Sequence, residues 1–214
     1  MEHYYKNIKG WFNWPELYSR AVQQAPKRAV FVEIGCYLGR STSYLAVEIL
    51  NSRKAITLIC CDLWEPSNKI GCTEEEFRAN LQPAVKAGLH LVPWRGDSAE
   101  AAKQVKDGSV DFVWVDGGHR YPQAIADIRA WWPKLKDGGW MGGDDLIHIG
   151  VRPAVEEFFG PECLPGDREE HNWARFQSAL VVTGKGADIR PNPGGWVWWT
   201  RSKSQDWTPK GLLG

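Results

Sequence analysis

The sequence predicts an α/β fold in which a mostly parallel sheet is covered by helices on both faces. Five short apolar runs alternate with five segments of helical pattern along residues 29–159, and the connections between them are short. Repeated strand–helix–strand units of this kind place successive strands parallel, because each helix crosses back over the sheet. A length of 214 residues suits one such domain.

The elements are expected in a regular order, beginning with a strand over Ala29–Ile34 and a helix over Ser41–Leu50. The later strands are expected at Ala55–Cys61, Leu89–Val92, Val110–Val115 and Gly139–Gly143, and the later helices at Thr73–Lys86, Ser98–Val105, Pro122–Leu135 and Val151–Phe159. Thr73 and Glu76 have the spacing of a capping box, and Pro122 suits the first turn of a helix.

The two ends of the chain depart from this alternation. An N-terminal helical extension is expected over residues 1–25, with its helix at Pro15–Gln24. Near the other end, Ala174–Thr183 and Gly195–Thr200 are strand-like and are joined by a Gly- and Pro-rich segment, which predicts an antiparallel hairpin and a sheet of seven strands. Residues 201–214 are expected to form a loose tail, and no internal repeat or linker divides residues 1–214, so we expect a single domain.

Composition and charge narrow the class of protein. The chain has 26 basic and 26 acidic residues, which gives no electrostatic case for nucleic acid or an anionic membrane as partner. No apolar run approaches the ~20 residues of a membrane helix, and the first residues lack the apolar stretch of a secretory signal. The five cysteines form no CxxC pair and are expected to be buried free thiols in a cytoplasmic protein.

Tryptophan is unusually abundant, with 13 residues in the chain. Four of them cluster near the C-terminus, at Trp196, Trp198, Trp199 and Trp207. Aromatic side chains suit an acceptor pocket, a packed core and a dimer interface equally well, so a homodimer stays open.

Polar residues recur where the predicted strands end. They are Glu33, Gly35, Gly39 and Ser41 after the first strand, Asp62 after the second, Asp97-Ser98 after the third, Asp116 and His119 after the fourth, and Asp144-Asp145 after the fifth. Ligands of open α/β sheets bind beyond these carboxyl ends. Helix capping explains Asp97 and one of the last two acids equally well.

The loop after the first strand argues against a dinucleotide. A dinucleotide site needs a second glycine at the position that Tyr37 occupies here, because the backbone must approach a pyrophosphate closely. Glu33 beside this loop suits instead a cofactor with a cationic end and no phosphate, such as S-adenosylmethionine. Asp62 at the end of the next strand suits the two ribose hydroxyls.

The segment Val110–Asp145 contains Asp-Gly-x-His-x-Tyr at 116–121, then Lys-x-Gly-Gly, then two acids. It resembles the bacterial class I S-adenosylmethionine-dependent methyltransferases with this motif. These are similar to macrolide sugar O-methyltransferases and, more distantly, to catechol-type O-methyltransferases. The resemblance covers about Ala29 to Phe159 and implies the Rossmann-like class I methyltransferase fold.

The resemblance also implies roles for individual residues. Those around the methionine part of the cofactor would be Glu33, Gly35, Tyr37, Gly39 and Ser41; Asp62 would hold the ribose; Leu63, Trp64, Asp97 and Ser98 would lie near the adenine; and Asp116, Asp144 and Asp145 match metal-ligand positions. Catechol-type relatives carry Asn at the position of Asp145, so this chain has additional negative charge there.

The resulting hypothesis is a methyltransferase acting on a hydroxyl of a small metabolite or sugar. Mg²⁺ or another divalent cation would lower the pKa of that hydroxyl, and His119 would remove its proton. A metal-independent O- or N-methyltransferase with His119 as base stays open, as does a non-catalytic Rossmann-like nucleotide-binding protein. Structural roles are equally open for His119 as a loop cap, Asp116 as an acceptor of loop amides and Asp145 as a turn cap. His148 suits the pocket or the surface, and Arg152 is expected to pair with Glu156 at i+4.

Overall fold

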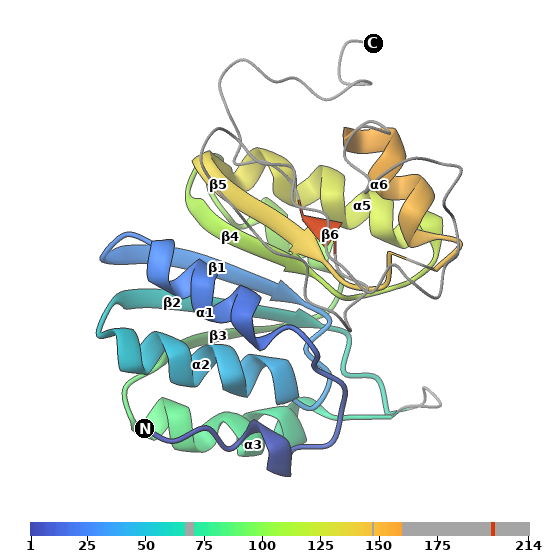
Figure 1. The fold of residues 1–214 in the computed structure, drawn as a ribbon. Helices are drawn as coiled ribbons and strands as arrows, with labels where there is room; N and C mark the ends of the chain where they lie inside the picture. Colours follow the sequence, from blue (N-terminus) through green and yellow to red (C-terminus); the bar gives the residue numbers. More distant parts are fainter. Residues whose placement is uncertain (67–70, 147, 160–197, 200–214) are drawn as a thin grey trace.

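The computed structural model describes residues 1–66, 71–146, 148–159 and 198–199. Their sheet has six strands in the order β3-β2-β1-β4-β5-β6 (Figure 1). The strands are β1 (Arg28–Ile34), β2 (Ala55–Asp62), β3 (His90–Arg95), β4 (Val110–Val115), β5 (Leu135–Gly143) and β6 (Trp198–Trp199). The first five are parallel, as predicted, and β6 pairs antiparallel with β5. The other predicted hairpin strand, and with it the seventh strand, lies outside the described residues.

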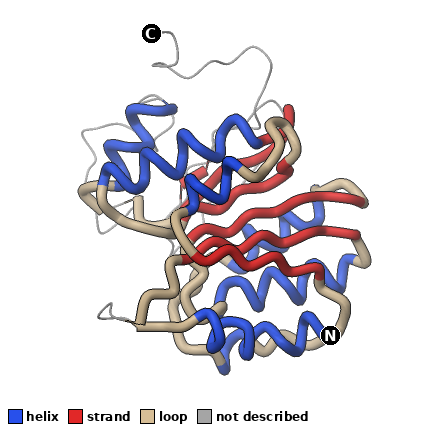
Figure 2. Tube along the Cα trace, turned by 180° about the vertical axis from the view of Figure 1, so that it is seen from behind, coloured by secondary structure: helices blue, strands red, loops and turns tan. Residues whose placement is uncertain are grey.

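The helices form two layers, one on each face of the sheet (Figures 1 and 2). One layer contains α1 (Pro15–Gln24), α2 (Arg40–Ser52) and α3 (Glu74–Lys86), and the other contains α4 (Ser98–Lys103), α5 (Tyr121–Trp131) and α6 (Val151–Phe159). Strand residues alternate between the two cores: Phe31 packs with the first layer, and Val32 and Ile34 pack with the second. The predicted three-layer arrangement is therefore confirmed.

Element ends differ most from the sequence prediction around Pro133 and at the end of β3. The helix expected over Pro122–Leu135 ends at Trp131 and continues as a 3₁₀ turn, η2 (Trp132–Lys134), because Pro133 removes a backbone donor. Strand β5 then begins at Leu135 instead of Gly139. Strand β3 runs on to Arg95 through Pro93. Proline lacks a backbone N–H, which β3 tolerates because, in the described sheet, it pairs with a strand on one side alone. The predicted capping box of Thr73 and Glu76 is confirmed.

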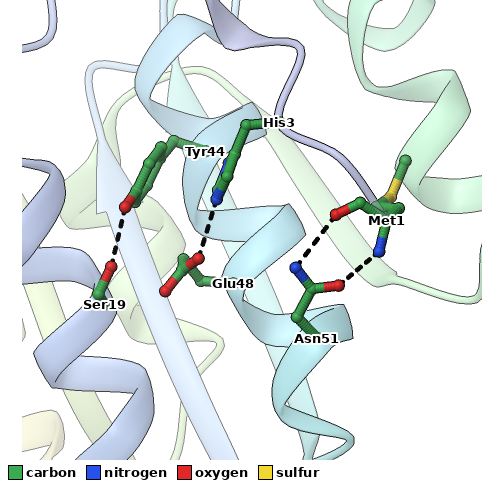
Figure 3. A network of polar contacts seen from close by, with 6 residues as sticks. All are labelled: Met1, His3, Ser19, Tyr44, Glu48 and Asn51. Atoms are coloured by element: carbon green, nitrogen blue, oxygen red, sulfur yellow. Dashed lines mark hydrogen bonds and ion pairs between the residues drawn. The ribbon is translucent and has the colours of Figure 1, made fainter.

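The N-terminal extension is packed onto α2, and a short 3₁₀ turn, η1 (Tyr5–Asn7), precedes α1. His3 stacks on Tyr44 with ring centroids 4.2 Å apart and meets the Glu48 carboxylate at 2.9 Å (Figure 3). The Tyr44 hydroxyl in turn lies 2.9 Å from the Ser19 hydroxyl of α1. The predicted helix at Pro15–Gln24 is confirmed, and these contacts pack it against α2.

Two further expectations concern the cysteines and the absence of a membrane helix. Among the described residues, Cys36, Cys60, Cys61 and Cys72 are buried free thiols, as predicted. No helix in the described ranges is long and apolar enough to cross a membrane.

The sheet order reverses where β1 lies between β2 and β4, and the loop after β1 presses against the end of β4 there. Gly35 has φ +84°, and a Cβ on it would lie 1.9 Å from the Asp116 carbonyl oxygen. The Asp116 N–H donates to the Ile34 carbonyl at 2.8 Å, and the Gly35 N–H donates to the Cys61 carbonyl at 2.8 Å. Only glycine allows these two loops to meet so closely.

Replacing Gly35 with alanine should therefore destabilise the fold strongly. Left-handed backbone costs an alanine about 1–2 kcal/mol, and relieving the collision adds about 1–3 kcal/mol. Gly108→Ala is the matched control, because Gly108 also has positive φ but has nothing within 4 Å of its ideal Cβ. Urea unfolding should show a clearly larger loss for Gly35→Ala, and equal losses would contradict the collision.

Asp127 of α5 predicts a pH-dependent stability. Its carboxylate is buried and accepts a hydrogen bond from the Ser98 hydroxyl. Burial raises its pKa to about 6 from 3.8. The stability linked to protonated Asp127 is present below pH 3.8 and is lost as the pH rises through about 6.

Asp127→Asn should accordingly be more stable relative to wild type above pH 6 than near pH 4. The gain should be on the order of 1–3 kcal/mol, because asparagine removes the cost of a buried charge and retains an acceptor oxygen. Thermal melts of both proteins at each pH measure this difference, and a pH-independent difference would argue against the raised pKa.

Candidate functional site

Glu33, the second-last residue of β1, is a buried carboxylate between α1 and α2. Its Oε1 accepts hydrogen bonds from the Ser41 hydroxyl at 2.6 Å and from the Tyr18 hydroxyl at 3.0 Å. Burial raises the pKa of Glu33, although these hydrogen bonds oppose the rise. Within the described part of the chain, Oε2 is buried without a hydrogen-bond partner. A buried acceptor in this state suits a cationic ligand group, which would remove the cost of its isolation.

Asp62, at the end of β2, holds two loops together. Its Oδ2 accepts from the Tyr37 N–H at 2.7 Å, and its Oδ1 accepts from the Trp64 N–H at 2.9 Å. The Trp64 indole N–H donates to the Tyr37 carbonyl at 2.9 Å. Tyr37 and Trp64 both have positive φ, at 47° and 42°. Asp62 therefore shapes the loop beside Glu33, and each of its oxygens keeps a lone pair for a ligand hydroxyl.

The four residues expected near adenine have different surroundings. The Trp64 indole is 1 % exposed and packs on Phe77 at 4.8 Å, so it supports the loop from within the core. Asp97 caps α4 by accepting from the N–H groups of residues 99 and 100, which matches the capping alternative. Ser98 is buried against Asp127. Leu63 is 46 % exposed, which makes it the apolar side chain of this set that is accessible to a ligand.

Gly39 also has a structural role, since it caps α2 with φ +86°. A Cβ at this position would lie 2.4 Å from a Leu81 methyl group, so glycine lets α2 begin close to α3. This placement orients Ser41 toward Glu33.

Three carboxylates meet where β4 and β5 end. Oxygen atoms of Asp116, Asp144 and Asp145 lie within 4.8 Å of one another. Asp144 is held by its N–H, which donates to the Val115 carbonyl at 3.1 Å, and its Oδ1 is buried without a partner in the described residues. Burial, and then repulsion among the acids, raises the pKa of Asp116 well above its usual range and that of Asp144 to about 7.

This acid cluster fits a divalent cation. Three oxygen donors on one side are a ligand set that Mg²⁺ accepts, with water completing its coordination. A cation would also offset the repulsion that raises the two pKa values. The sequence prediction that these three residues come together is thus met by the geometry, while occupancy by a metal stays a prediction.

His119 and His148 flank Asp145 on the exposed side of the cluster. The His119 Nε2 lies 2.6 Å from Asp145 Oδ2, and the His148 Nε2 lies 3.4 Å from Asp145 Oδ1. The hydrogen bond to Asp145 is the main cause that raises the pKa of His119. Sequence reasoning left His148 undecided and did not foresee its pairing with Asp145, although their i,i+3 spacing was a usable signal. The predicted Arg152–Glu156 pair is present at 2.8 Å.

Comparison with known proteins identifies the family. A family model described as "Methyltransferase domain" matches residues 32–146, which include every residue of the site except Tyr18 and His148. Protein y4gI of Sinorhizobium fredii (strain NBRC 101917 / NGR234) is 31 % identical over 114 residues. That match covers 51 % of this chain and 12 % of the Sinorhizobium protein, so this chain spans a small part of its relative's length.

Solved structures share the fold at low sequence identity. CalS11, a TDP-rhamnose 3'-O-methyltransferase of calicheamicin biosynthesis, is 18 % identical with a TM-score of 0.53, over 71 % of this chain and 70 % of CalS11. Cofactor-bound Rv0187 from MTB is 17 % identical with a TM-score of 0.56, over 74 % of each chain. The chain therefore belongs to the methyltransferase-domain family, in agreement with the enzyme class that the sequence predicted.

Proposed function

We propose that this protein transfers the methyl group of S-adenosylmethionine to a hydroxyl oxygen of a small metabolite or sugar, with assistance from a divalent cation. The observation that carries the proposal is the placement of two acidic groups at adjacent strand ends. Glu33 lies on β1 just before the cofactor loop, and the three-acid cluster follows β4 and β5. The contact between Gly35 and Asp116 keeps Glu33 and the three-acid cluster side by side. The shared fold with a sugar O-methyltransferase supports the same substrate class.

The cofactor half of the site rests on Glu33 and Asp62. The Oε2 atom of Glu33, which has no partner among the described residues, suits the ammonium group of the cofactor's methionine part. The remaining lone pairs of Asp62 suit the ribose hydroxyls, and the exposed Leu63 side chain suits one face of the adenine. When bound, S-adenosylmethionine supplies a methyl group on a positively charged sulfur. Methyl transfer is an in-line displacement, so the main task of these residues is alignment.

The acceptor half rests on Asp116, Asp144, Asp145 and His119. The three carboxylates would hold the cation, which lowers the pKa of a bound hydroxyl and orients it when present. His119 would take the proton of the acceptor hydroxyl. Asp145 orients the His119 ring through the 2.6 Å contact. The carboxylate of Asp145 would then serve both the cation and the base.

A second candidate function uses His119 without a metal. The His119–Asp145 pair is the arrangement of an imidazole base oriented by a carboxylate. The two candidates separate when release of S-adenosylhomocysteine is measured with a panel of hydroxylated small molecules, before and after dialysis against EDTA. Loss of activity that Mg²⁺ restores supports the metal-assisted reaction, and full activity without metal supports the second candidate.

Asp62→Ala should weaken S-adenosylhomocysteine binding by about 1–3 kcal/mol, because the ribose hydroxyls lose a charged acceptor and the loop loses its anchor. Isothermal titration calorimetry measures the affinity. Asp107→Ala is the matched control, since Asp107 is an exposed carboxylate paired with Lys134. An affinity of Asp62→Ala equal to wild type would remove Asp62 from the cofactor site.

Asp144→Asn should abolish stimulation of activity by Mg²⁺ and weaken Mn²⁺ binding in a paramagnetic resonance titration, because a charged ligand is lost. Its affinity for S-adenosylhomocysteine should stay within about twofold of wild type, a change below ~0.5 kcal/mol. A parallel loss of metal and cofactor binding would indicate a role in folding instead.

A further inference from the structure

Two imidazoles and one carboxylate converge beside the acid cluster. Ligand atoms of His119, Asp145 and His148 lie within 4.8 Å of one another. The two rings approach opposite oxygens of Asp145, and their centroids are 4.6 Å apart at an interplanar angle of 41°. Both histidine side chains are nearly half exposed, at 45 % and 44 %, so ions in solution have access to them.

The backbone holds these three residues in place before any ligand arrives. Asp145 has φ +60°, a left-handed conformation that is strained for a residue with a side chain. The His148 N–H donates to the Asp145 carbonyl at 2.8 Å and closes the turn between them. Gly150 packs so tightly on the His119 loop that a Cβ there would lie 2.3 Å from the His119 carbonyl oxygen. The loops after β4 and β5 are therefore fixed relative to each other.

A surface ion pair is an incomplete explanation of this arrangement. Asp145 is only 16 % exposed, and its left-handed backbone is a conformation that the surrounding structure has to hold. One carboxylate also needs only one histidine to be neutralised, and here two are directed at it. Two imidazoles and a carboxylate on one side, with the other side open to water, form a ligand set that transition metals accept.

We propose that His119, Asp145 and His148 bind a divalent cation of the transition series, such as Zn²⁺, Co²⁺ or Mn²⁺. The site adjoins the three-oxygen cluster and shares Asp145 with it. Imidazole nitrogen favours transition metals over Mg²⁺, whereas the acid cluster offers only oxygen. This inference concerns metal binding and does not rest on the proposed reaction.

Cobalt binding tests the proposal in the full chain. The protein is stripped with EDTA, dialysed and titrated with Co²⁺, and the visible absorption and paramagnetically shifted imidazole N–H resonances are recorded. We expect the wild type to show histidine-bound Co²⁺ that Zn²⁺ displaces and that millimolar Mg²⁺ does not. His148→Gln and His119→Gln should each weaken Co²⁺ binding about tenfold or more, and each should lose one shifted resonance.

Matched variants make the outcome decisive. His90→Gln is the control, because His90 is an exposed histidine on β3 that bonds to Thr57 on β2. This variant should bind Co²⁺ as the wild type does. Asp116→Asn should keep both shifted resonances while losing the response to Mg²⁺, so failure of the proposed reaction and failure of this site give different results. Thermal melts establish that each variant is folded.

Either of two results would overturn the proposal. One is Co²⁺ binding by both histidine variants with wild-type affinity and spectra. The other is a thiolate-to-cobalt absorption band, which would place the ion at the cysteines instead.

Discussion

The close approach of Gly35 to the Asp116 carbonyl is the constraint on which the candidate site depends. Parallel strands bring their carboxyl ends to one edge, but side chains normally keep adjacent loops apart. Here the missing side chain lets the loop after β1 rest on the end of β4. Glu33 and Asp62 consequently lie near enough to Asp116 to contribute to its raised pKa. The two proposed halves of the site are thus coupled electrostatically.

The site gathers several carboxylates at one edge of the sheet. Lysine or arginine pairs elsewhere satisfy acids such as Asp111, which accepts from Lys136. At the edge of the sheet, in contrast, Glu33 and Asp144 each retain a buried oxygen without a partner in the described residues. Such groups cost stability unless a ligand meets them. The ligands that suit them carry positive charge, namely a cofactor ammonium group and a metal cation.

Much of the fold followed from local patterns in the sequence. Strand–helix alternation and the capping box at Thr73 are read from residues close together in the chain, and both are confirmed. The grouping of Asp116, Asp144 and Asp145 was implied by the family resemblance, and the parallel topology brings the ends of β4 and β5 together. The link from Asp62 to the N–H groups of Tyr37 and Trp64 could not be foreseen, because it depends on positive φ at two residues that rarely adopt it. The burial of the Trp64 indole depends on its contact with Phe77 from α3, which no local pattern encodes.

A crystal structure of the protein with S-adenosylhomocysteine and Mn²⁺, with an anomalous difference map, tests most directly whether cofactor and cation share one centre. The account predicts the cofactor's amino group at hydrogen-bond distance from Glu33, its ribose on Asp62, and an anomalous peak coordinated by Asp116 and Asp144. A cofactor bound away from the β1 loop, or the absence of a peak at the three acids while Mn²⁺ is bound elsewhere, would contradict it.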